Sequence, residues 1–320
     1  MIPIKKVYIT SNIPDVADEL LKEKFEVDKN VDNKKLTKEE LIELGNAYDG
    51  LITSLTDEFD AEALSRIKRV KIFANYAVGY NNFDMDYVRK NNLIVTNTPE
   101  VLSDTTAETA ISLLFAVSRR IVEADNYVRK GKWDGFSPKL LLGKDIHSKT
   151  LGIIGAGRIG KRFAEKMRGF HMQVLYHNHD RDLGFEKSFN ALYKSLEDLL
   201  KESDIVSIHV PLTKETKHMI TKKELDLMKS DAILINTSRG AVINEKDLIK
   251  VLKNKKIYGA GLDVYENEPR INEELMTINN VVLTPHIGSA SIETREEMAI
   301  MAAKNVLNVL SGRRPNNKVY

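Results

Sequence analysis

The sequence has no cysteine and a single tryptophan among its 320 residues. Without cysteine the chain cannot form disulfide bonds, a thiolate nucleophile or a cysteine-based zinc site. It also has almost no net charge, since 48 basic residues are balanced by 46 acidic ones. A formal charge of +2 gives no electrostatic reason to expect binding to nucleic acid or to a membrane surface.

Long hydrophobic runs are absent as well. Apolar stretches such as residues 111–117 are far shorter than the roughly 20 residues that a membrane-spanning helix needs. Residues 1–6 lack the charged-then-apolar order of a signal peptide, so we expect a cytoplasmic protein. With 42% hydrophobic residues, the chain is long enough for two domains that each have their own core.

What the sequence does contain is a glycine-rich segment near its middle, Gly155-Ala156-Gly157-Arg158-Ile159-Gly160. It follows the apolar run Leu151–Ile154, which is typical of a buried strand, and precedes a helix-like pattern over Lys161–Phe170. In a dinucleotide site the first glycine permits a tight turn, the second lets backbone approach a pyrophosphate, and the third lets helix and strand pack closely. The context therefore predicts a dinucleotide site, and a merely structural turn is the alternative.

Short apolar runs alternate with amphipathic segments along most of the chain, which predicts parallel sheets flanked by helices. The strands expected before the glycine-rich segment are Val7–Thr10, Gly50–Thr53, Val70–Ala74 and Ile94–Thr96. Those expected from residue 151 onward are Leu151–Ile154, Gln173–Tyr176, Ile205–Val210, Ala232–Asn236, Tyr258–Val264 and Val281–Leu283, which match a complete doubly wound nucleotide-binding domain. Further helices are expected over Val16–Phe25, Lys38–Ala47 behind a capping box of Thr37 and Glu40, Ser103–Lys130 and Ile292–Leu310.

Side chains that suit hydride-transfer chemistry lie at strand ends in the second half of the chain. Arg239 follows one expected strand, His286 follows another, and the carboxylates Asp263, Glu266 and Glu268 lie in or just after a third. Ligands of parallel sheets bind at the carboxyl ends of strands. Reduction of a 2-keto acid needs a proton donor that titrates near neutrality and a cation that orients the carboxylate, roles that suit histidine and arginine. The set predicts a dehydrogenase, although each residue alone is also typical of a surface charge or a structural contact.

Five segments spread over nearly the whole chain form a specific set. They are residues 75–82 (NYAVGYNN), 155–160 (GAGRIG), 235–240 (INTSRG), 261–269 (GLDVYENEP) and 284–288 (TPHIG). Together they resemble the D-isomer-specific 2-hydroxyacid dehydrogenases, and most closely their glyoxylate/hydroxypyruvate reductase branch. The resemblance implies NAD(P)H-dependent reduction of glyoxylate or hydroxypyruvate. It also implies an α/β fold of two doubly wound parallel-sheet domains, a flavodoxin-like substrate domain of residues 1–98 plus 288–320 and a Rossmann domain of residues 99–287.

The same resemblance implies roles for single residues. Arg239 would hold the carboxylate and carbonyl of the substrate, His286 would be the general acid in reduction and the base in oxidation, and Glu268 would be its partner. Backbone amides of Val78 and Gly79 would hold the substrate carboxylate, with an ordinary turn as the alternative. The cofactor would be lined by Thr106, Gly155, Gly157, Arg158, Ile159, Gly160, Val210, Pro211, Thr237, Ser238 and Asp263, the last of them near the nicotinamide unless it is only a satisfied buried carboxylate.

The residue that distinguishes NAD from NADP is expected about 20 residues after the glycines, at the end of the second strand. His177 stands where an NAD-dependent enzyme would carry an aspartate, which removes repulsion of a 2′-phosphate. His177, Asn178, His179 or Arg181 would be able to donate to that phosphate, which slightly favours NADP(H). Asp180 is the opposing observation, because a small shift of register would let it bind the ribose. His177 and His179 have no evident third ligand, so no metal site is expected.

The other histidines suggest no chemistry of their own. His209 is expected near the cofactor cleft, and His147, His171 and His218 are expected on the surface.

A homodimer joined through the nucleotide-binding domains is also implied by the resemblance. The interface candidates are Ser103–Lys130 and the apolar loop Lys132–Gly143, because an apolar loop left in water is poorly explained. The alternative is that the loop folds onto its own chain. Two other functions stay open: a dehydrogenase of D-lactate or another D-2-hydroxy acid, and a non-catalytic NAD(H)-sensing protein similar to certain corepressors.

Overall fold

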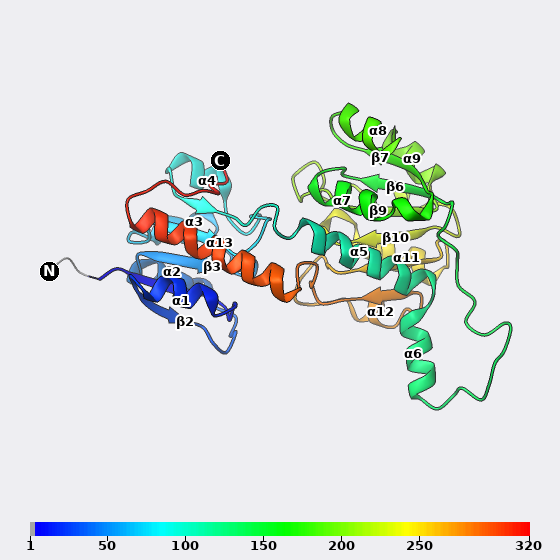
Figure 1. Cartoon of the computed structure of the whole chain (residues 1–320), viewed down its shortest axis with the longest axis horizontal. Helices are drawn as coiled ribbons and strands as arrows, with labels where there is room; N and C mark the ends of the chain where they lie inside the picture. Colours follow the sequence, from blue (N-terminus) through cyan, green and yellow to red (C-terminus); the bar gives the residue numbers. More distant parts are fainter. Residues whose placement is uncertain (1–3) are drawn as a thin grey trace. The chain divides into compact units, whose positions relative to one another are not determined.

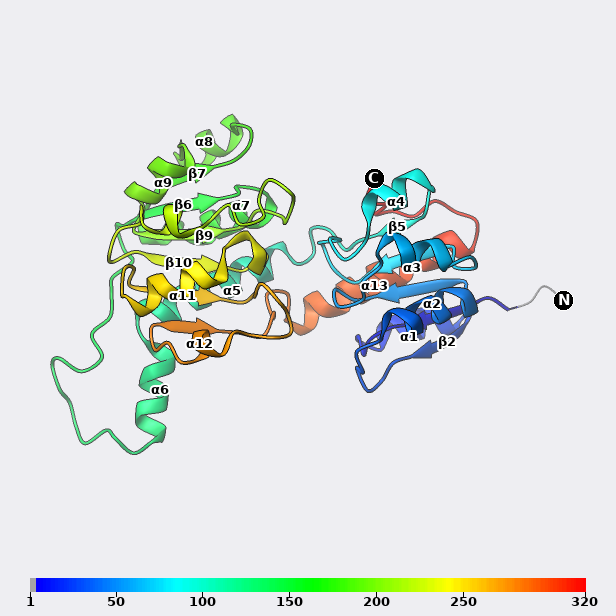
Figure 2. The ribbon, with the colours of Figure 1, turned by 180° about the vertical axis from the view of Figure 1, so that it is seen from behind.

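The computed structural model describes residues 4–320 and divides the chain into two compact units (Figures 1 and 2). Unit 1 consists of Met1–Leu102 with Ala290–Tyr320, and unit 2 consists of Ser103–Ser289. Each unit has one wholly parallel sheet with helices packed around it. The expected α/β fold with two doubly wound parallel sheets is confirmed.

The sheet of unit 1 has five strands in the order β2-β1-β3-β4-β5. The strands are β1 (Lys6–Ile9), β2 (Glu26–Lys29), β3 (Gly50–Thr53), β4 (Ile72–Asn75) and β5 (Val95–Thr96). Every residue of β3 and β4 is buried, which explains why both strands are apolar up to their last residues, Thr53 and Asn75. The edge strand β2 was not predicted, because its residues Glu-Val-Asp-Lys are exposed or half-buried and form no apolar run.

The helices of unit 1 come from both ends of the chain. They are α1 (Val16–Lys22), α2 (Lys38–Ala47), α3 (Ala61–Arg66), α4 (Met85–Lys90) and α13 (Ile292–Leu310). Helix α13 packs against α1 and against β3 and β4, so the last segment of the chain covers a sheet built from the first. After α13 the chain returns to β5, where the Val319 amide donates to the Val95 carbonyl oxygen at 3.1 Å.

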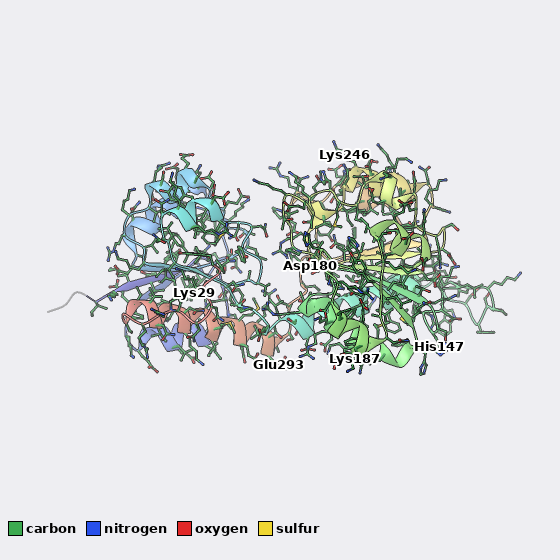
Figure 3. All side chains as sticks on the ribbon, turned by 90° about the horizontal axis from the view of Figure 1, so that it is seen from above. Lys29, His147, Asp180, Lys187, Lys246 and Glu293 are labelled. Atoms are coloured by element: carbon green, nitrogen blue, oxygen red, sulfur yellow. The ribbon has the colours of Figure 1, made fainter. Side chains whose placement is uncertain are left out.

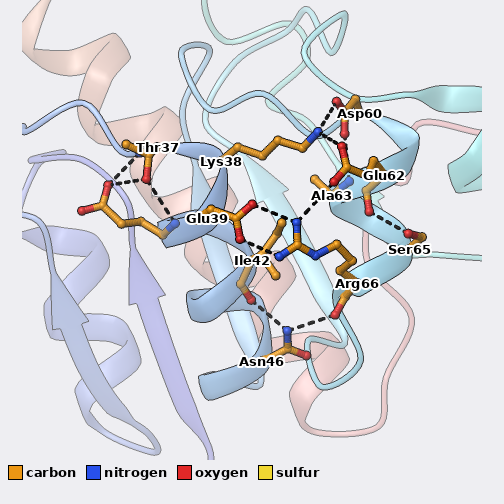
Figure 4. Close-up of polar contacts among 11 residues, drawn as sticks. Thr37, Lys38, Glu39, Ile42, Asn46, Asp60, Glu62, Ala63, Ser65 and Arg66 are labelled. Carbon is orange, nitrogen blue, oxygen red and sulfur yellow. Dashed lines mark hydrogen bonds and ion pairs between the residues drawn. The ribbon is translucent and has the colours of Figure 1, made fainter.

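The expected capping box at the start of α2 is confirmed, since Thr37 and Glu40 each bind the backbone amide of the other. Such caps typically stabilise a helix by about 1 kcal/mol. The two nitrogens of the Arg66 guanidinium on α3 bind the carboxylate of Glu39 on α2 at 2.8 and 2.5 Å (Figure 4). Lys38 joins the same two helices by binding Asp60 at 2.8 Å. These ion pairs are exposed, so we expect them to orient the helices more than to stabilise them.

The sheet of unit 2 has seven strands in the order β12-β11-β10-β9-β6-β7-β8. The strands are β6 (Thr150–Ile154), β7 (Gln173–His177), β8 (Leu192–Tyr193), β9 (Ile205–Ile208), β10 (Ile233–Asn236), β11 (Gly259–Leu262) and β12 (Val281–Leu283). Six were predicted, and the seventh, β8, is a two-residue edge strand. The strand order reverses between β6 and β9, and in such sheets a ligand crevice forms beyond the strand ends at that point.

Two hydrophobic clusters make up the core of unit 2, one including Leu199, Val206 and Leu234 and the other including Leu114, Ile153 and Phe163. The helices of the unit are α5 (Ser103–Ser118), α6 (Ile121–Arg129), α7 (Arg158–Lys166), α8 (Leu183–Phe189), α9 (Leu196–Glu202), α10 (Lys222–Leu225), α11 (Glu245–Lys253) and α12 (Glu273–Met276), with 3₁₀ turns η1 (Arg168–Phe170) and η2 (Gly240–Val242). Within residues 4–320, no helix is both long and apolar enough to cross a membrane.

The continuous helix expected over Ser103–Lys130 is wrong. The chain breaks between α5 and α6 at Arg120, whose φ of +53° is left-handed, and no glycine or proline marks the break. Helix α6 has no buried residue, and with the loop that follows it projects away from the sheet of unit 2 (Figures 1 and 2). The loop was expected either at an interface or against its own chain, and the exposure of Phe136 at 91% speaks against the second alternative.

Candidate active site

The glycine-rich segment forms the turn between β6 and α7. Gly155 has a φ of +96°, and a Cβ added there would lie 2.8 Å from the backbone nitrogen of Val210. At Gly160 an added Cβ would lie 2.3 Å from the carbonyl oxygen of Gly155, so the start of α7 packs directly on the turn. At Gly157, the N-cap of α7, no atom of the described chain lies within 4 Å of an added Cβ. The helix start is therefore uncrowded, and its first-turn amides suit a pyrophosphate.

The loop after β10 is held by the side chain of Asn236. Its Oδ1 accepts hydrogen bonds from the amide and the hydroxyl of Ser238 at 3.0 and 2.8 Å, and its Nδ2 donates to the Arg239 carbonyl oxygen at 3.0 Å. Thr237 between them is 7% exposed, and its hydroxyl has no hydrogen-bond partner in residues 4–320. A buried hydroxyl without a partner is costly, so Thr237 fits a site in which a ligand supplies the missing partner.

The other residues expected around the cofactor lie on neighbouring elements of unit 2. Arg158 and Ile159 are in the first turn of α7, and Val210 and Pro211 come two and three residues after the end of β9. Thr106 is a buried residue of α5. Together with the open helix start, these positions fit a dinucleotide along the strand ends of this sheet.

The residue that follows β7 forms a hydrogen bond with the glycine turn. β7 ends at His177, which pairs in register with Ile154 at the end of β6. The next residue, Asn178, accepts the amide proton of Ala156 on its Oδ1 at 2.7 Å. The Nδ1 of His177 lies 3.0 Å from the carbonyl oxygen of Lys194, and because a carbonyl can only accept, Nδ1 carries the proton. Nε2 is then the nitrogen of His177 that remains for another partner.

Two residues that bear on the choice between NAD and NADP lie farther along this loop. Arg181 donates through Nε and Nη2 to the carboxylate of Glu186 at 2.6 and 2.8 Å, so its guanidinium is already paired. Asp180, which is labelled in Figure 3, is exposed. One of its oxygens lies 3.2 Å from Nδ1 of His179. The register places His177, and not Asp180, at the strand end. We therefore expect His177 and Asn178 to be the residues nearest the ribose.

The segments after β11 and β12 bring a histidine and a carboxylate together. Nδ1 of His286 lies 2.7 Å from Oε2 of Glu268, and the other oxygen of Glu268 accepts the Tyr265 amide at 2.9 Å. Burial alone would raise the pKa of Glu268, but the hydrogen bond and charge of His286, with the Tyr265 amide and the Arg239 charge, hold that pKa below its ordinary value. Glu268 is therefore ionised at neutral pH, and Nε2 of His286 is the nitrogen left for a substrate.

Asp263 fixes the backbone on which His286 stands. The carboxylate is fully buried and accepts hydrogen bonds from the Thr284 hydroxyl at 2.6 Å and from the amides of Ile287 and Gly288 at 2.8 and 2.7 Å. His286 itself has a φ of +55°, a left-handed conformation that is strained for a histidine. Burial raises the pKa of Asp263, and these hydrogen bonds with the nearby His286 oppose that rise. The role expected for Asp263, near the nicotinamide, stays a prediction; what the structure shows is a tether for the histidine loop.

Arg239 lies in the loop after β10, and its guanidinium interacts electrostatically with the Glu268 carboxylate. Its Nη1 donates to the Ser238 carbonyl oxygen at 2.7 Å. Burial lowers the pKa of the guanidinium, and the Glu268 carboxylate opposes that shift. Arginine stays protonated under such shifts, so unit 2 presents a cation, a histidine and a carboxylate at neighbouring strand ends.

Two further histidines make specific side-chain contacts in unit 2. His218, expected on the surface, is half-buried, and its Nε2 lies 2.7 Å from Oε1 of Glu266. His209 follows β9 with its Nε2 2.9 Å from the Ser207 hydroxyl, and burial lowers its pKa to about 3, so it is neutral. The sequence contained no signal for the pairing of His218, because its partner is 48 residues away. His147 and His171 are exposed as expected.

Comparisons with known proteins agree with this geometry. The family model of the D-isomer specific 2-hydroxyacid dehydrogenase NAD-binding domain matches residues 111–288. Glyoxylate reductase of Thermococcus litoralis is 49% identical over 318 residues, which are 98% of this chain and 96% of that relative.

Solved structures show the same relationship. A protein from Thermus thermophilus is similar with a TM-score of 0.91 and 40% identity, over 98% of this chain and 100% of that one. An NADPH-dependent glyoxylate/hydroxypyruvate reductase from Sinorhizobium meliloti, in complex with NADP and malonate, has a TM-score of 0.87 and 29% identity, over 99% and 97% of the two chains. Because the family model covers more than half of the chain and close relatives cover nearly all of it, the chain belongs to the D-isomer specific 2-hydroxyacid dehydrogenases, which are NAD(P)-dependent oxidoreductases.

Proposed function

We propose that this enzyme reduces glyoxylate or hydroxypyruvate, to glycolate or D-glycerate, with NAD(P)H. The observation that carries the proposal is the 2.7 Å contact between His286 and Glu268, in the unit that also holds Arg239 and the glycine turn. The 49% identical relative from Thermococcus litoralis is itself a glyoxylate reductase, which supports this substrate class.

In this proposal His286 is the acid of the reduction. The nicotinamide, when bound, supplies the hydride that reduces the carbonyl carbon. His286, protonated on both nitrogens, donates the proton on Nε2 to the carbonyl oxygen, which becomes the hydroxyl of the product. Glu268 holds Nδ1 and stabilises the protonated ring, because an opposite charge within hydrogen-bond distance favours the charged form. In oxidation the same Nε2 takes the proton back.

Arg239 would orient the substrate. Its planar guanidinium presents parallel N–H groups that match a carboxylate and an adjacent carbonyl oxygen. The positive charge also polarises the carbonyl and stabilises the oxygen as negative charge develops on it. The amides of Val78 and Gly79, in unit 1, are proposed to bind the substrate carboxylate.

For the cofactor we propose NADP(H) in preference to NAD(H). His177 at the end of β7 lacks the negative charge that would repel a 2′-phosphate, and its Nε2 is the nitrogen not bound to Lys194. The pairing of Arg181 with Glu186 weakens one argument for NADP(H), since that guanidinium would have to leave its partner to bind phosphate. His177 therefore carries the proposal.

We further propose a cytoplasmic homodimer joined through the nucleotide-binding units. Helix α6 exposes Ile121, Val122 and Val128, and the following loop exposes Trp133 and Phe136. Apolar surface of this extent commonly marks a protein interface. Its location on unit 2 fits a second copy that makes the same contact.

The test is oxidation of NADPH and NADH by the purified protein with glyoxylate, hydroxypyruvate and pyruvate, measured as kcat/KM for each pair. Preference for glyoxylate or hydroxypyruvate supports the proposal, and a preference for pyruvate would assign the protein to the D-lactate dehydrogenases instead. Cofactor binding without turnover of any 2-keto acid would reject catalysis and favour a nucleotide-sensing role.

A further inference from the structure

Three consecutive carbonyl groups after β4 are each held by a donor inside unit 1. The carbonyl oxygen of Ala77 accepts the Thr98 amide at 2.9 Å. That of Val78 accepts Nδ2 of Asn97 at 2.9 Å. That of Gly79 accepts Nδ2 of Asn75 at 2.8 Å. Each of these three peptide units is therefore oriented by a hydrogen bond to its carbonyl group.

The same three peptide units carry the amide protons of Val78, Gly79 and Tyr80. In a planar trans peptide the N–H points away from the C=O of the same unit. Fixing the carbonyls of residues 77, 78 and 79 therefore points the amides of Val78, Gly79 and Tyr80 away from the donors that hold those carbonyls. Within the described chain, none of these three amides donates a hydrogen bond to protein. Neighbouring backbone N–H groups without a partner in the protein suit the binding of an anion.

The two asparagines are themselves fixed by further contacts. Asn75 is 1% exposed, and its Oδ1 lies 3.2 Å from the Thr53 hydroxyl, which donates to it. This contact leaves Nδ2 as the group that faces Gly79. The backbone amide of Asn97 donates to the Asn317 carbonyl oxygen at 3.2 Å, so the C-terminal tail holds Asn97 in turn.

We propose that Asn75 and Asn97 are positioning residues of the substrate site: their side-chain amides hold the carbonyls of Gly79 and Val78 so that the amides of Tyr80 and Gly79 face the substrate carboxylate. The Val78 amide is oriented through the Ala77 carbonyl, which the Thr98 amide holds. The inference rests on the proposed function, because it needs a carboxylate substrate. A segment held in this way does not have to reorganise on binding, which strengthens binding by lowering its entropic cost. Neither asparagine touches the reacting atoms.

Asn97 is the better residue for mutation, because it is half-buried whereas Asn75 lies in the core. In Asn97→Ala, the KM for glyoxylate and the Kd of oxamate, a stable 2-keto acid analogue, should both rise about ten-fold, equivalent to about 1.4 kcal/mol. The Kd of NADPH should not change, and kcat should fall less than KM rises. Asn97→Gln keeps a side-chain amide donor and should recover part of the affinity. Oxamate binding is measured by calorimetry on the NADPH-bound enzyme.

The matched control is Asn91→Ala, which removes a similar bond, from Nδ2 to the Tyr87 carbonyl oxygen at 2.9 Å, at the exposed C-cap of α4. Both alanine variants should lose similar thermal stability, and only Asn97→Ala should lose oxamate affinity. Unchanged oxamate affinity in Asn97→Ala, or an equal loss in the control, would overturn the inference. If the wild type turns over no 2-keto acid, the proposed function fails, while oxamate titration of the same variants still decides whether Asn97 positions a carboxylate site.

Discussion

Nδ1 of His286 lies 2.7 Å from Oε2 of Glu268, and the backbone of His286 is left-handed, with a φ of +55°. Such a conformation costs a non-glycine residue on the order of 1 kcal/mol or more. The structure offsets this cost through Asp263, which binds the amides of Ile287 and Gly288 directly after the histidine. The proposed acid and its partner therefore depend on a second carboxylate, Asp263, that holds the loop of His286.

Replacing His286 with alanine should abolish turnover while leaving cofactor affinity nearly intact, because the proton donor is removed and the glycine turn is not touched. We expect kcat to fall by about 10²–10⁴-fold, the range typical of general acid catalysis. The measurement is steady-state NADPH oxidation with glyoxylate, accompanied by NADPH titration. The control is His218→Ala, which breaks the other histidine–glutamate pair at 2.7 Å and should keep its turnover. Near wild-type rates in His286→Ala would reject the assignment.

Replacing Glu268 with glutamine should shift the pH profile. The pKa of Glu268 is held low, so at neutral pH the carboxylate is charged and stabilises the protonated ring of His286. Reduction needs that protonated ring. Without the charge, kcat/KM for reduction should therefore begin to fall at a lower pH, and the rate of oxidation should rise at a lower pH. Measuring both directions between pH 5 and 9 checks the sign, and identical profiles in variant and wild type would contradict it.

Replacing Asp263 with asparagine should impair both stability and turnover. An asparagine side chain can accept on one atom only, so at least one of the Ile287 and Gly288 amides would lose its buried acceptor, at a cost of about 1–3 kcal/mol. We expect a lower melting temperature and a kcat reduced by about ten-fold or more, because the loop no longer fixes His286. Asp204→Asn is the matched control, since Asp204 accepts the Thr150 amide at 2.8 Å at the start of the strands. That variant should lose stability without losing kcat relative to its folded fraction.

Replacing His177 with aspartate should shift preference towards NADH. The carboxylate would accept hydrogen bonds from ribose hydroxyls and repel a 2′-phosphate at the end of β7. The quantity to measure is the ratio of kcat/KM for NADH to that for NADPH, which we expect to rise by about ten-fold or more. Asp180→Asn should leave this ratio unchanged, because Asp180 is exposed beyond the strand end. A lower kcat/KM for NADH in Asp180→Asn would show that Asp180 binds the ribose.

Replacing Phe136 with glutamate should weaken the proposed dimer. Phe136 is 91% exposed in the single chain, so the charge costs the folded monomer little, whereas burying it in an interface is expensive. Light scattering after size exclusion would report the mass. Leu183→Glu on α8, also exposed at 68%, is the control and should leave the mass unchanged. A wild-type protein that is monomeric at micromolar concentration would refute this assembly.

Sequence reasoning found those parts of the molecule whose signal is local. The glycine turn, the buried strands and helix α13 each have a pattern contained within a few residues. The same reasoning missed β2 and β8, because edge strands exposed to water carry no apolar run. It also missed the break at Arg120, since an arginine in a left-handed conformation has no signature of its own.

The site was predicted in the same uneven way. Arg239, Glu268 and His286 stand at strand ends within recognisable motifs, and so they could be named. The tether from Asp263 to Gly288 spans 25 residues, and the bonds from Asn75 and Asn97 to the 78–79 carbonyls depend on how β4 and β5 lie side by side. Such contacts follow from the folded backbone, and no spacing in the sequence predicts them.

The discontinuity of unit 1 has a consequence for synthesis. Residues 103–289 form an uninterrupted unit that can fold as soon as it has been made. Residues 1–102 cannot complete their packing until α13, which covers β3 and β4, has been synthesised. During translation at about 5–20 residues per second, the first hundred residues therefore spend several seconds or more outside the ribosome with an uncovered apolar sheet. The segment that is made first is among the last to complete its packing, and this interval is when the nascent chain is most exposed to aggregation and most dependent on chaperones.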